Sequence, residues 1–159
     1  MHIVGNTTSC WSLTAYASRT LVALGYHTTK QIDSNFDEDE REEIHAALAW
    51  CYHFDRLMSL LLLRPPSLPP PVVRVSSLVN HDPRNPMSIF AKVMLEMVPI
   101  HEKILELTLE SASKPNARSS ASVDADVEQL RSEMTKLYTM MEQVCTTSQA
   151  EGIPRADLI

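Results

Sequence analysis

The sequence predicts an all-α protein built as an irregular array of about four main helices. Glycine is scarce, with 3 among 159 residues, and hydrophobic residues make up 44% of the chain, which is enough for a core. Apolar residues recur at spacings of three and four, the period of an amphipathic helix, and alternating β-branched segments are few. The length is typical of one domain, so we expect residues 1–159 to form a single domain.

The first helix is predicted over residues 7–25. Its apolar positions are Trp11, Ala15, Leu21, Val22 and Leu24. Gly25 follows directly, and glycine just past the last turn is a common stop because it tolerates left-handed backbone.

A longer, central helix is predicted over residues 37–64. It opens with the acidic run Asp37–Glu40, where the positive end of the helix dipole favours negative charge. From Ala46 onward the helix is apolar on nearly every side, which is typical of a buried helix. Asp55 and Arg56 interrupt this apolar stretch.

These two charges must be paired, because an isolated buried charge is very costly. Asp55 could meet Ser59 one turn on or a donor on another helix, and Arg56 could reach a carbonyl or an acid in a neighbouring segment. Arg64 could cap the free carbonyls at the helix end with its cation. A catalytic use of the pair is disfavoured, because no nucleophile or second acid accompanies it.

A proline-rich loop is predicted over residues 65–84. Its prolines stop the helix, since proline lacks an amide donor and clashes with the preceding turn. They are Pro65, Pro66, Pro69, Pro70 and Pro71. An ordered loop that wraps the domain is the favoured interpretation, and a segment that binds a proline-reading partner is the alternative.

The next helix is predicted over residues 85–110, with Asn85 as its cap and Pro86 at its first position. Its apolar stripe comprises Ile89, Val93, Met97, Ile100, Ile104 and Leu107. Pro99 lies inside the helix and is expected to kink it near Leu95.

Residues 111–123 are small and polar and predict a flexible linker. The last helix is predicted over residues 124–150, and Gly152 and Pro154 are expected to end it. Its apolar residues alternate three and four apart: Val127, Leu130, Met134, Leu137, Met141 and Val144. This heptad pattern covers fewer than three repeats, so a stripe that packs within the fold is favoured, and dimerisation through the stripe is the alternative.

Motifs for catalysis and metal binding are missing from the sequence. It has no GxSxG, HExxH, P-loop or GxGxxG pattern. Cys10, Cys51 and Cys145 are odd in number and far apart, which predicts free thiols and no metal finger. On a helix His53 would point away from the face that Cys51 shares with Asp55, so these three could not converge on one metal. We therefore expect no enzyme activity, no metal site and no cofactor in this chain.

Charge and hydropathy exclude further classes. The formal net charge is −6, and such a surface repels nucleic-acid phosphates. The N-terminus has neither the basic nor the apolar region of a signal peptide. The longest apolar stretch, Ala46–Leu63, contains charged residues that are costly at a bilayer centre, so no contact with a membrane is expected.

The block from Trp50 to Pro69 resembles the signature of a known family. An aromatic and apolar run, Asp-Arg, a Ser-Leu-rich turn and Arg-Pro-Pro are similar to the signature of the fungal-specific transcription factor domain. Upstream, the helix over 17–27 resembles the family's preceding helix, which ends in Leu-Gly-x-His. With the later helices the resemblance covers residues 10–145. The signature residues are Leu24, Gly25, His27, Asp55, Arg56, Ser59, Arg64, Pro65 and Pro66.

The resemblance implies a fragment of a larger α-helical regulatory domain, the middle region of fungal zinc-cluster transcription factors. Leu63 departs from the family, which has glycine before Arg-Pro-Pro. Family members read DNA with an N-terminal six-cysteine cluster that holds two zinc ions, and three scattered cysteines cannot build it. DNA and zinc would therefore belong to an absent N-terminal module, and the chain would be a short gene product, a truncated gene model or an excised piece.

The function that the resemblance implies is transcription regulation in the nucleus, with the cytoplasm as the alternative location. Its partners would be proteins, either the transcription machinery or a second copy in a homodimer. A stand-alone helical interaction module that titrates its partners is the alternative function.

Overall fold

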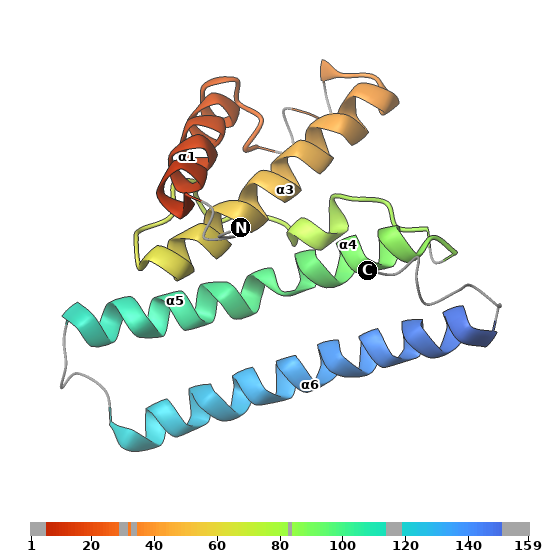
Figure 1. Ribbon diagram of the computed structural model, residues 1–159. Coiled ribbons are helices and arrows are strands. Elements are labelled where there is room, and N and C mark those ends of the chain that lie inside the picture. Colours follow the sequence, from red (N-terminus) through yellow and green to blue (C-terminus); the bar gives the residue numbers. More distant parts are fainter. Residues whose placement is uncertain (1–5, 29–31, 33–34, 83, 114–118, 151–159) are drawn as a thin grey trace. The chain divides into compact units, whose positions relative to one another are not determined.

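The computed structural model describes residues 6–28, 32, 35–82, 84–113 and 119–150. Every element within these residues is helical and none is a strand, which confirms the predicted all-α fold. The chain divides into two compact units, Met1–Asn80 and His81–Ile159. Figure 1 labels the helices of each unit. That the two units form one domain stays a prediction.

The first unit begins with helix α1, Thr7–Ala23. The Asn6 side chain caps its start by accepting from the backbone N–H of Ser9 at 3.1 Å. Past its end, Gly25 has a φ of 80°, and the N–H groups of Gly25 and Tyr26 donate into the last turn at 3.0 and 2.9 Å. Gly25 is therefore the stop that the sequence predicts, because left-handed backbone costs glycine little.

Helix α3, Glu38–Leu62, is the central element of the first unit, and both α1 and the short 3₁₀ helix η1, Val75–Ser77, contact it. Its buried residues are Leu48, Ala49, Tyr52, His53, Asp55, Arg56, Met58 and Ser59. Phe54 and Leu61 are exposed by 43% and 59%. The predicted burial on nearly every side is thus wrong for the side that carries these two residues.

The end of α3 closes in the same way as the end of α1. The N–H of Arg64 donates to the carbonyl of Ser59 at 2.9 Å. Leu63, directly before Arg64, adopts the left-handed backbone conformation, with a φ of 51° and a ψ of 45°. Among the described residues Leu63 is the one non-glycine residue with positive φ. Leu63 therefore occupies a conformation that glycine adopts more easily.

The second unit opens with α4, Pro86–Glu96, and α5, Val98–Ser113. Asn85 caps α4 by accepting from the N–H groups of Met87 and Ser88, and Pro86 follows it, as predicted. The helix predicted over 85–110 is divided between these two elements at Met97. Pro99 is expected to kink the helix near Leu95. It has no N–H to donate to the Leu95 carbonyl, which accounts for the break.

Helix α6, Ser120–Ala150, runs back along α5 and α4 (Figure 1). It begins four residues before the predicted 124, and α5 extends through Ser113, so the predicted linker over 111–123 is too long at both ends. Helix α5 continues through the small polar residues Ser111 and Ser113, whose hydroxyls donate to backbone carbonyls one turn earlier. Residues 114–118 and the predicted stops Gly152 and Pro154 lie outside the described residues.

Candidate functional site

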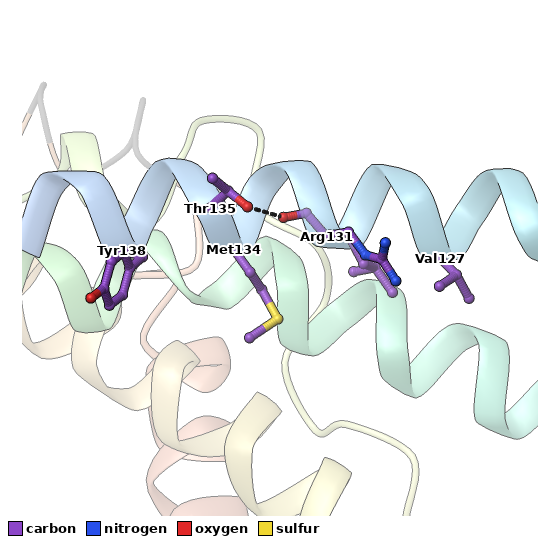
Figure 2. Close-up of a pocket in the computed structure, with 6 residues that line it drawn as sticks. Val127, Arg131, Met134, Thr135 and Tyr138 are labelled. Carbon is purple, nitrogen blue, oxygen red and sulfur yellow. Dashed lines mark hydrogen bonds between the residues drawn. The ribbon is translucent and has the colours of Figure 1, made fainter.

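An exposed apolar stripe runs along α6. Its members are Val127, Met134, Tyr138 and Met141, with exposed fractions of 47%, 58%, 63% and 48%. We name these four residues the α6 stripe. Figure 2 shows Val127, Met134 and Tyr138 projecting from the same side of the helix, where they line a surface groove together with Leu130, Arg131 and Thr135. Large apolar side chains gathered on one exposed face are typical of a surface that another protein covers.

The packed side of α6 lies next to this stripe. Leu130 and Leu137 are half-buried, and Asp126 forms an ion pair with Lys103 of α5 at 3.0 Å. The heptad pattern of the sequence therefore divides in the structure. Leu130 and Leu137 belong to the packed side. The prediction that Met134 and Met141 also pack within the fold is wrong, because both are exposed.

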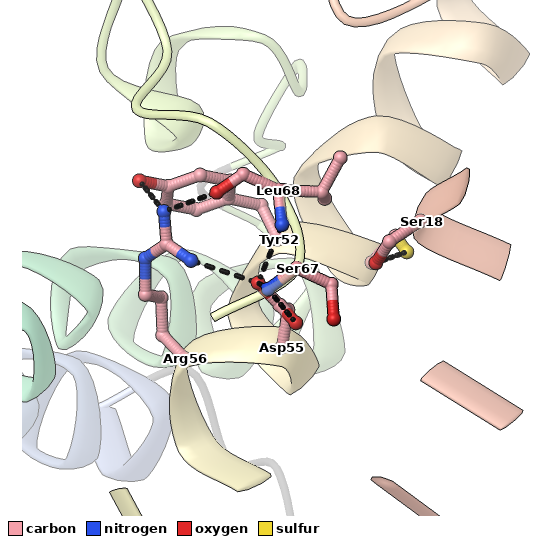
Figure 3. Close-up of polar contacts among 7 residues, drawn as sticks. Ser18, Tyr52, Asp55, Arg56, Ser67 and Leu68 are labelled. Carbon is pink, nitrogen blue, oxygen red and sulfur yellow. Dashed lines mark hydrogen bonds and ion pairs between the residues drawn. The ribbon is translucent and has the colours of Figure 1, made fainter. Parts of the chain in front are cut away.

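A second candidate site lies inside the first unit, where two charged side chains are buried. Asp55 and Arg56 are 1% and 2% exposed, and the Arg56 Nη1 donates to the Asp55 Oδ2 at 2.7 Å. Figure 3 shows the loop after α3 crossing over this pair. The sequence prediction that both charges are buried and paired is confirmed.

The Asp55 carboxylate holds the loop through its backbone. The N–H of Ser67 donates to both carboxylate oxygens at 2.9 Å, and the N–H of Leu68 donates to Oδ2 at 3.0 Å. The predicted Asp55–Ser59 contact is wrong, since the buried Ser59 Oγ has no hydrogen-bond partner among the described residues. The loop returns to α3 and brings two backbone amides to the carboxylate. Helical spacing could not predict these partners, because it relates only residues of the same helix.

Arg56 holds the same loop by a carbonyl. Its Nη2 donates to the Leu68 carbonyl at 2.9 Å and to the Tyr52 hydroxyl at 2.7 Å, and its guanidinium carbon lies 4.1 Å from the centre of the Tyr52 ring. The expectation that Arg56 reaches a carbonyl in a neighbouring segment is confirmed. We name Tyr52, Asp55, Arg56 and the backbone of Ser67 and Leu68 the loop clamp.

The loop clamp has the chemistry of a structural lock. Its carboxylate accepts hydrogen bonds from backbone amides and its guanidinium donates to protein oxygens, which is the condition for keeping charges buried. Sequence reasoning missed Tyr52, although its position four residues before Arg56 places both on one helix face. It also missed the two amides, because backbone groups carry no sequence signal.

The remaining signature residues lie at the two helix ends. Leu24, Gly25 and His27 follow α1, and Pro65 and Pro66 follow α3 as exposed residues. The structure does not bring these two groups together in one site. The end of α3 contacts the start of α1, where Trp11 lies, whereas Leu24, Gly25 and His27 follow the end of α1.

The Arg64 guanidinium carbon lies 4.4 Å from the centre of the Trp11 ring. This cation–π contact corrects the prediction that its cation caps the helix carbonyls, since the backbone N–H of Arg64 makes that closure. The contact ties the end of α3 to α1 instead.

Cys51 lies at the contact between α1 and α3. Its Sγ is 3.4 Å from the Oγ of Ser18, which is fully buried. Burial raises the pKa of the Cys51 thiol, the hydrogen bond with Ser18 acts in the opposite direction, and the charge of Asp55 raises the pKa further. The thiol is therefore held in its protonated, weakly nucleophilic form.

Neither a metal cluster nor a membrane span is found in the part of the chain that the structure describes. No group of three or more His, Cys, Asp or Glu side chains is arranged there to hold an ion. No helix in the same residues has the length and apolar character to cross a bilayer.

Comparison with protein families gives one match. The model of the fungal specific transcription factor domain matches residues 3–144, a range that includes the loop clamp and all four residues of the α6 stripe. Neither the curated proteins nor the solved structures contain a match to this chain.

Proposed function

Because the chain belongs to the fungal specific transcription factor domain family, a family of transcription-factor regulatory regions and not of enzymes, we propose that it regulates transcription by binding other proteins in the nucleus. The observation that carries this proposal is the α6 stripe. Four large apolar side chains lie exposed on one helix face, and a protein partner would remove them from water.

Catalysis has little support in the described residues. The one buried charged pair that the sequence singled out is occupied by the amides and carbonyl of the loop, so no group of the loop clamp is free to act on a substrate. The Cys51 thiol is held protonated by burial. We therefore assign the chain no enzyme activity.

DNA recognition and zinc are assigned to a separate module. The chain has 3 cysteines, fewer than the six of a two-zinc cluster, and its net charge of −6 opposes contact with phosphates. In this proposal a zinc-cluster module reads DNA, and the present chain needs no cofactor of its own.

A reporter assay tests the proposal. The chain is fused to an unrelated DNA-binding module, and transcription of a reporter gene is compared with that of the module alone. We expect the fusion to change reporter output, and we expect the M134E/Y138E variant to lose this change because charge on the stripe opposes an apolar partner. The S132E/T139E variant is the control, since it places the same two charges on other exposed positions of α6.

Two results would count against the proposal. A fusion whose reporter output equals that of the DNA-binding module alone would remove the regulatory role. An M134E/Y138E variant that works as well as the S132E/T139E control would remove the α6 stripe as the surface responsible.

A stand-alone interaction module that dimerises through α6 is the second candidate function. The spacing of three and four residues from Val127 to Met141, with the stripe exposed, favours it. Analytical ultracentrifugation of the chain would then show a dimer that M134E/Y138E converts to a monomer. A wild-type chain that stays monomeric at high concentration would exclude this function and leave the regulatory proposal standing.

A further inference from the structure

Ser67 lies near the start of the proline-rich loop, where it is half-buried between the exposed Pro66 and the buried Leu68. Its backbone N–H belongs to the loop clamp, whereas its hydroxyl takes no part in the hydrogen bonds of the clamp. Arg64 stands three residues before it. Basophilic serine kinases read an arginine at this distance with carboxylates in their substrate groove, so the segment has the charge pattern of a kinase substrate.

Two other serines share this spacing and differ in their surroundings. Ser59 follows Arg56 but is fully buried inside α3, where no kinase can reach it. Ser77 follows Arg74 and is exposed in η1, with its hydroxyl donating to the Arg74 carbonyl at 2.7 Å. Ser77 therefore provides a comparison for Ser67 within the same chain.

We propose that Ser67 is a phosphorylation site for a serine kinase that reads Arg64, and that the phosphate opens the loop clamp. ATP supplies the γ-phosphoryl group. A bond forms between its phosphorus and the Ser67 Oγ, the bond to the leaving ADP breaks, and the hydroxyl proton passes to the base of the kinase.

The opening follows from the charge that is already buried. The N–H of Ser67 bonds both oxygens of the Asp55 carboxylate at 2.9 Å, and Figure 3 shows the Ser67 side chain beside that carboxylate. A phosphate on the same residue adds about −1.5 to −2 charges at pH 7 next to an acid, an arrangement that disrupts by repulsion.

Arg56 is the cation bonded to the Asp55 carboxylate, and its terminal nitrogens already have hydrogen-bond acceptors. Its two terminal nitrogens donate to Asp55, Tyr52 and the Leu68 carbonyl. At 2% exposure it has little room to turn toward a phosphate outside the clamp. Releasing the loop relieves the repulsion while Asp55 and Arg56 stay together.

This regulation rests on the proposed function only for its biological outcome, a change in the surface that the regulatory region offers to partners. The opening of the loop clamp itself depends only on the residues of the loop and of the clamp. Five of the seven residues from Pro65 to Pro71 are prolines without an N–H, so Ser67 and Leu68 carry the two exchangeable amides of that segment, and both donate to Asp55.

The test measures hydrogen exchange at these two amides. The chain is incubated with cyclic-AMP-dependent protein kinase, Mg²⁺ and ATP, and mass spectrometry locates the phosphate. We expect phosphate on Ser67 and a rise of about tenfold or more in the exchange rates of the Ser67 and Leu68 amides, because each loses a hydrogen bond to a charged group. Circular dichroism should show the helices unchanged.

Two variants serve as controls. S77A should still be phosphorylated at Ser67 and still open, whereas S67A should keep slow exchange at Leu68 after kinase treatment, since the clamp uses only the backbone at position 67. A kinase that modifies Ser77 and leaves Ser67 untouched would overturn the proposal. Phosphate on Ser67 with unchanged or slower exchange would overturn it as well, and neither result bears on the reporter assay.

Discussion

Asp55 connects α3 to the loop that follows it, and its replacement should be costly. Asp55→Ala removes a carboxylate that accepts from three backbone or side-chain donors and leaves Arg56 buried without its counter-charge. Breaking a buried pair from one side costs about 3–5 kcal/mol. We expect the free energy of unfolding to fall by about that amount in urea titrations followed by circular dichroism.

Glu43→Ala is the control for this change. Glu43 is an exposed acid on the same helix, so its removal should alter the free energy of unfolding by less than about 0.5 kcal/mol. If Asp55→Ala were as mild as Glu43→Ala, the loop clamp would not hold the loop to α3.

Replacing Leu63 with glycine should stabilise the protein, because the backbone conformation at this position favours glycine. Its φ of 51° places the β-carbon against the following carbonyl, at a cost of roughly 1–2 kcal/mol for a residue other than glycine. The side chain is 57% exposed, so little packing is lost when it is removed. Leu63→Gly should therefore raise the free energy of unfolding by about 1 kcal/mol.

The matched variant for this prediction is Leu61→Gly. Leu61 is 59% exposed, close to the value for Leu63, but it lies within α3 and has no positive φ. Glycine there should lower the free energy of unfolding by about 1 kcal/mol. Equal effects from both glycines would show that the left-handed backbone at Leu63 carries no strain.

The start of α3 carries both a side-chain cap and a run of acidic residues. The Asp37 carboxylate accepts from the N–H of Glu40 at 2.9 Å, while Glu38, Asp39 and Glu40 follow within the first turn. Asp37→Ala should lower the midpoint of thermal unfolding because it removes about 1 kcal/mol of capping. Asp37→Asn keeps an acceptor oxygen and should leave the midpoint nearly unchanged. If Asn were as harmful as Ala, charge rather than capping would be responsible.

The helices are the part of the fold that the sequence predicts well. Spacings of three and four locate them, and local signals such as Gly25 and Asn85 mark their ends because a stop or a cap depends on neighbouring residues. Ends set by less distinctive residues are harder to locate. Ser119 accepts from the N–H of Ser122 at 3.3 Å and precedes α6, yet it lies within a serine-rich segment that predicts a linker.

The candidate sites were harder to predict, because each depends on which elements meet. The sequence indicates that Asp55 and Arg56 need partners, but the partners are backbone groups brought back by a loop. For α6, one heptad pattern contains both the half-buried Leu130 and the exposed Met134. Periodicity shows that a helix face is apolar without showing what covers it.

The family match, which extends from residue 3 to residue 144, covers most of both compact units. Each unit contributes one candidate feature, the loop clamp in the first and the α6 stripe in the second. The chain thus combines a lock that fixes a loop with an exposed apolar surface, which the proposed function assigns to a protein partner. The two features are separate in sequence, so variants of one should leave the other intact, and the reporter and exchange experiments can be interpreted independently.

The stability of the whole chain should depend on pH through His101. Burial lowers the pKa of His101 below its ordinary value of 6.5, so the folded state resists a proton that the unfolded chain accepts. Where the unfolded state binds more protons, stability rises with pH. Stability from this residue is therefore complete well above pH 6.5 and is lost as the pH falls through the ordinary value. Urea titrations between about pH 8 and pH 5.5 should show this loss, in a range where most carboxylates stay ionised.

His101→Gln separates this effect from other titrations, because glutamine keeps a polar side chain that does not titrate. The free energy of unfolding of this variant should change less with pH across the same range, and the difference between the two proteins should grow as the pH falls. Parallel curves for wild type and variant would contradict the prediction, since they would mean that His101 binds its proton equally well in both states. A steeper curve for the variant would contradict it more strongly, because it would require the folded state to favour the charged imidazole.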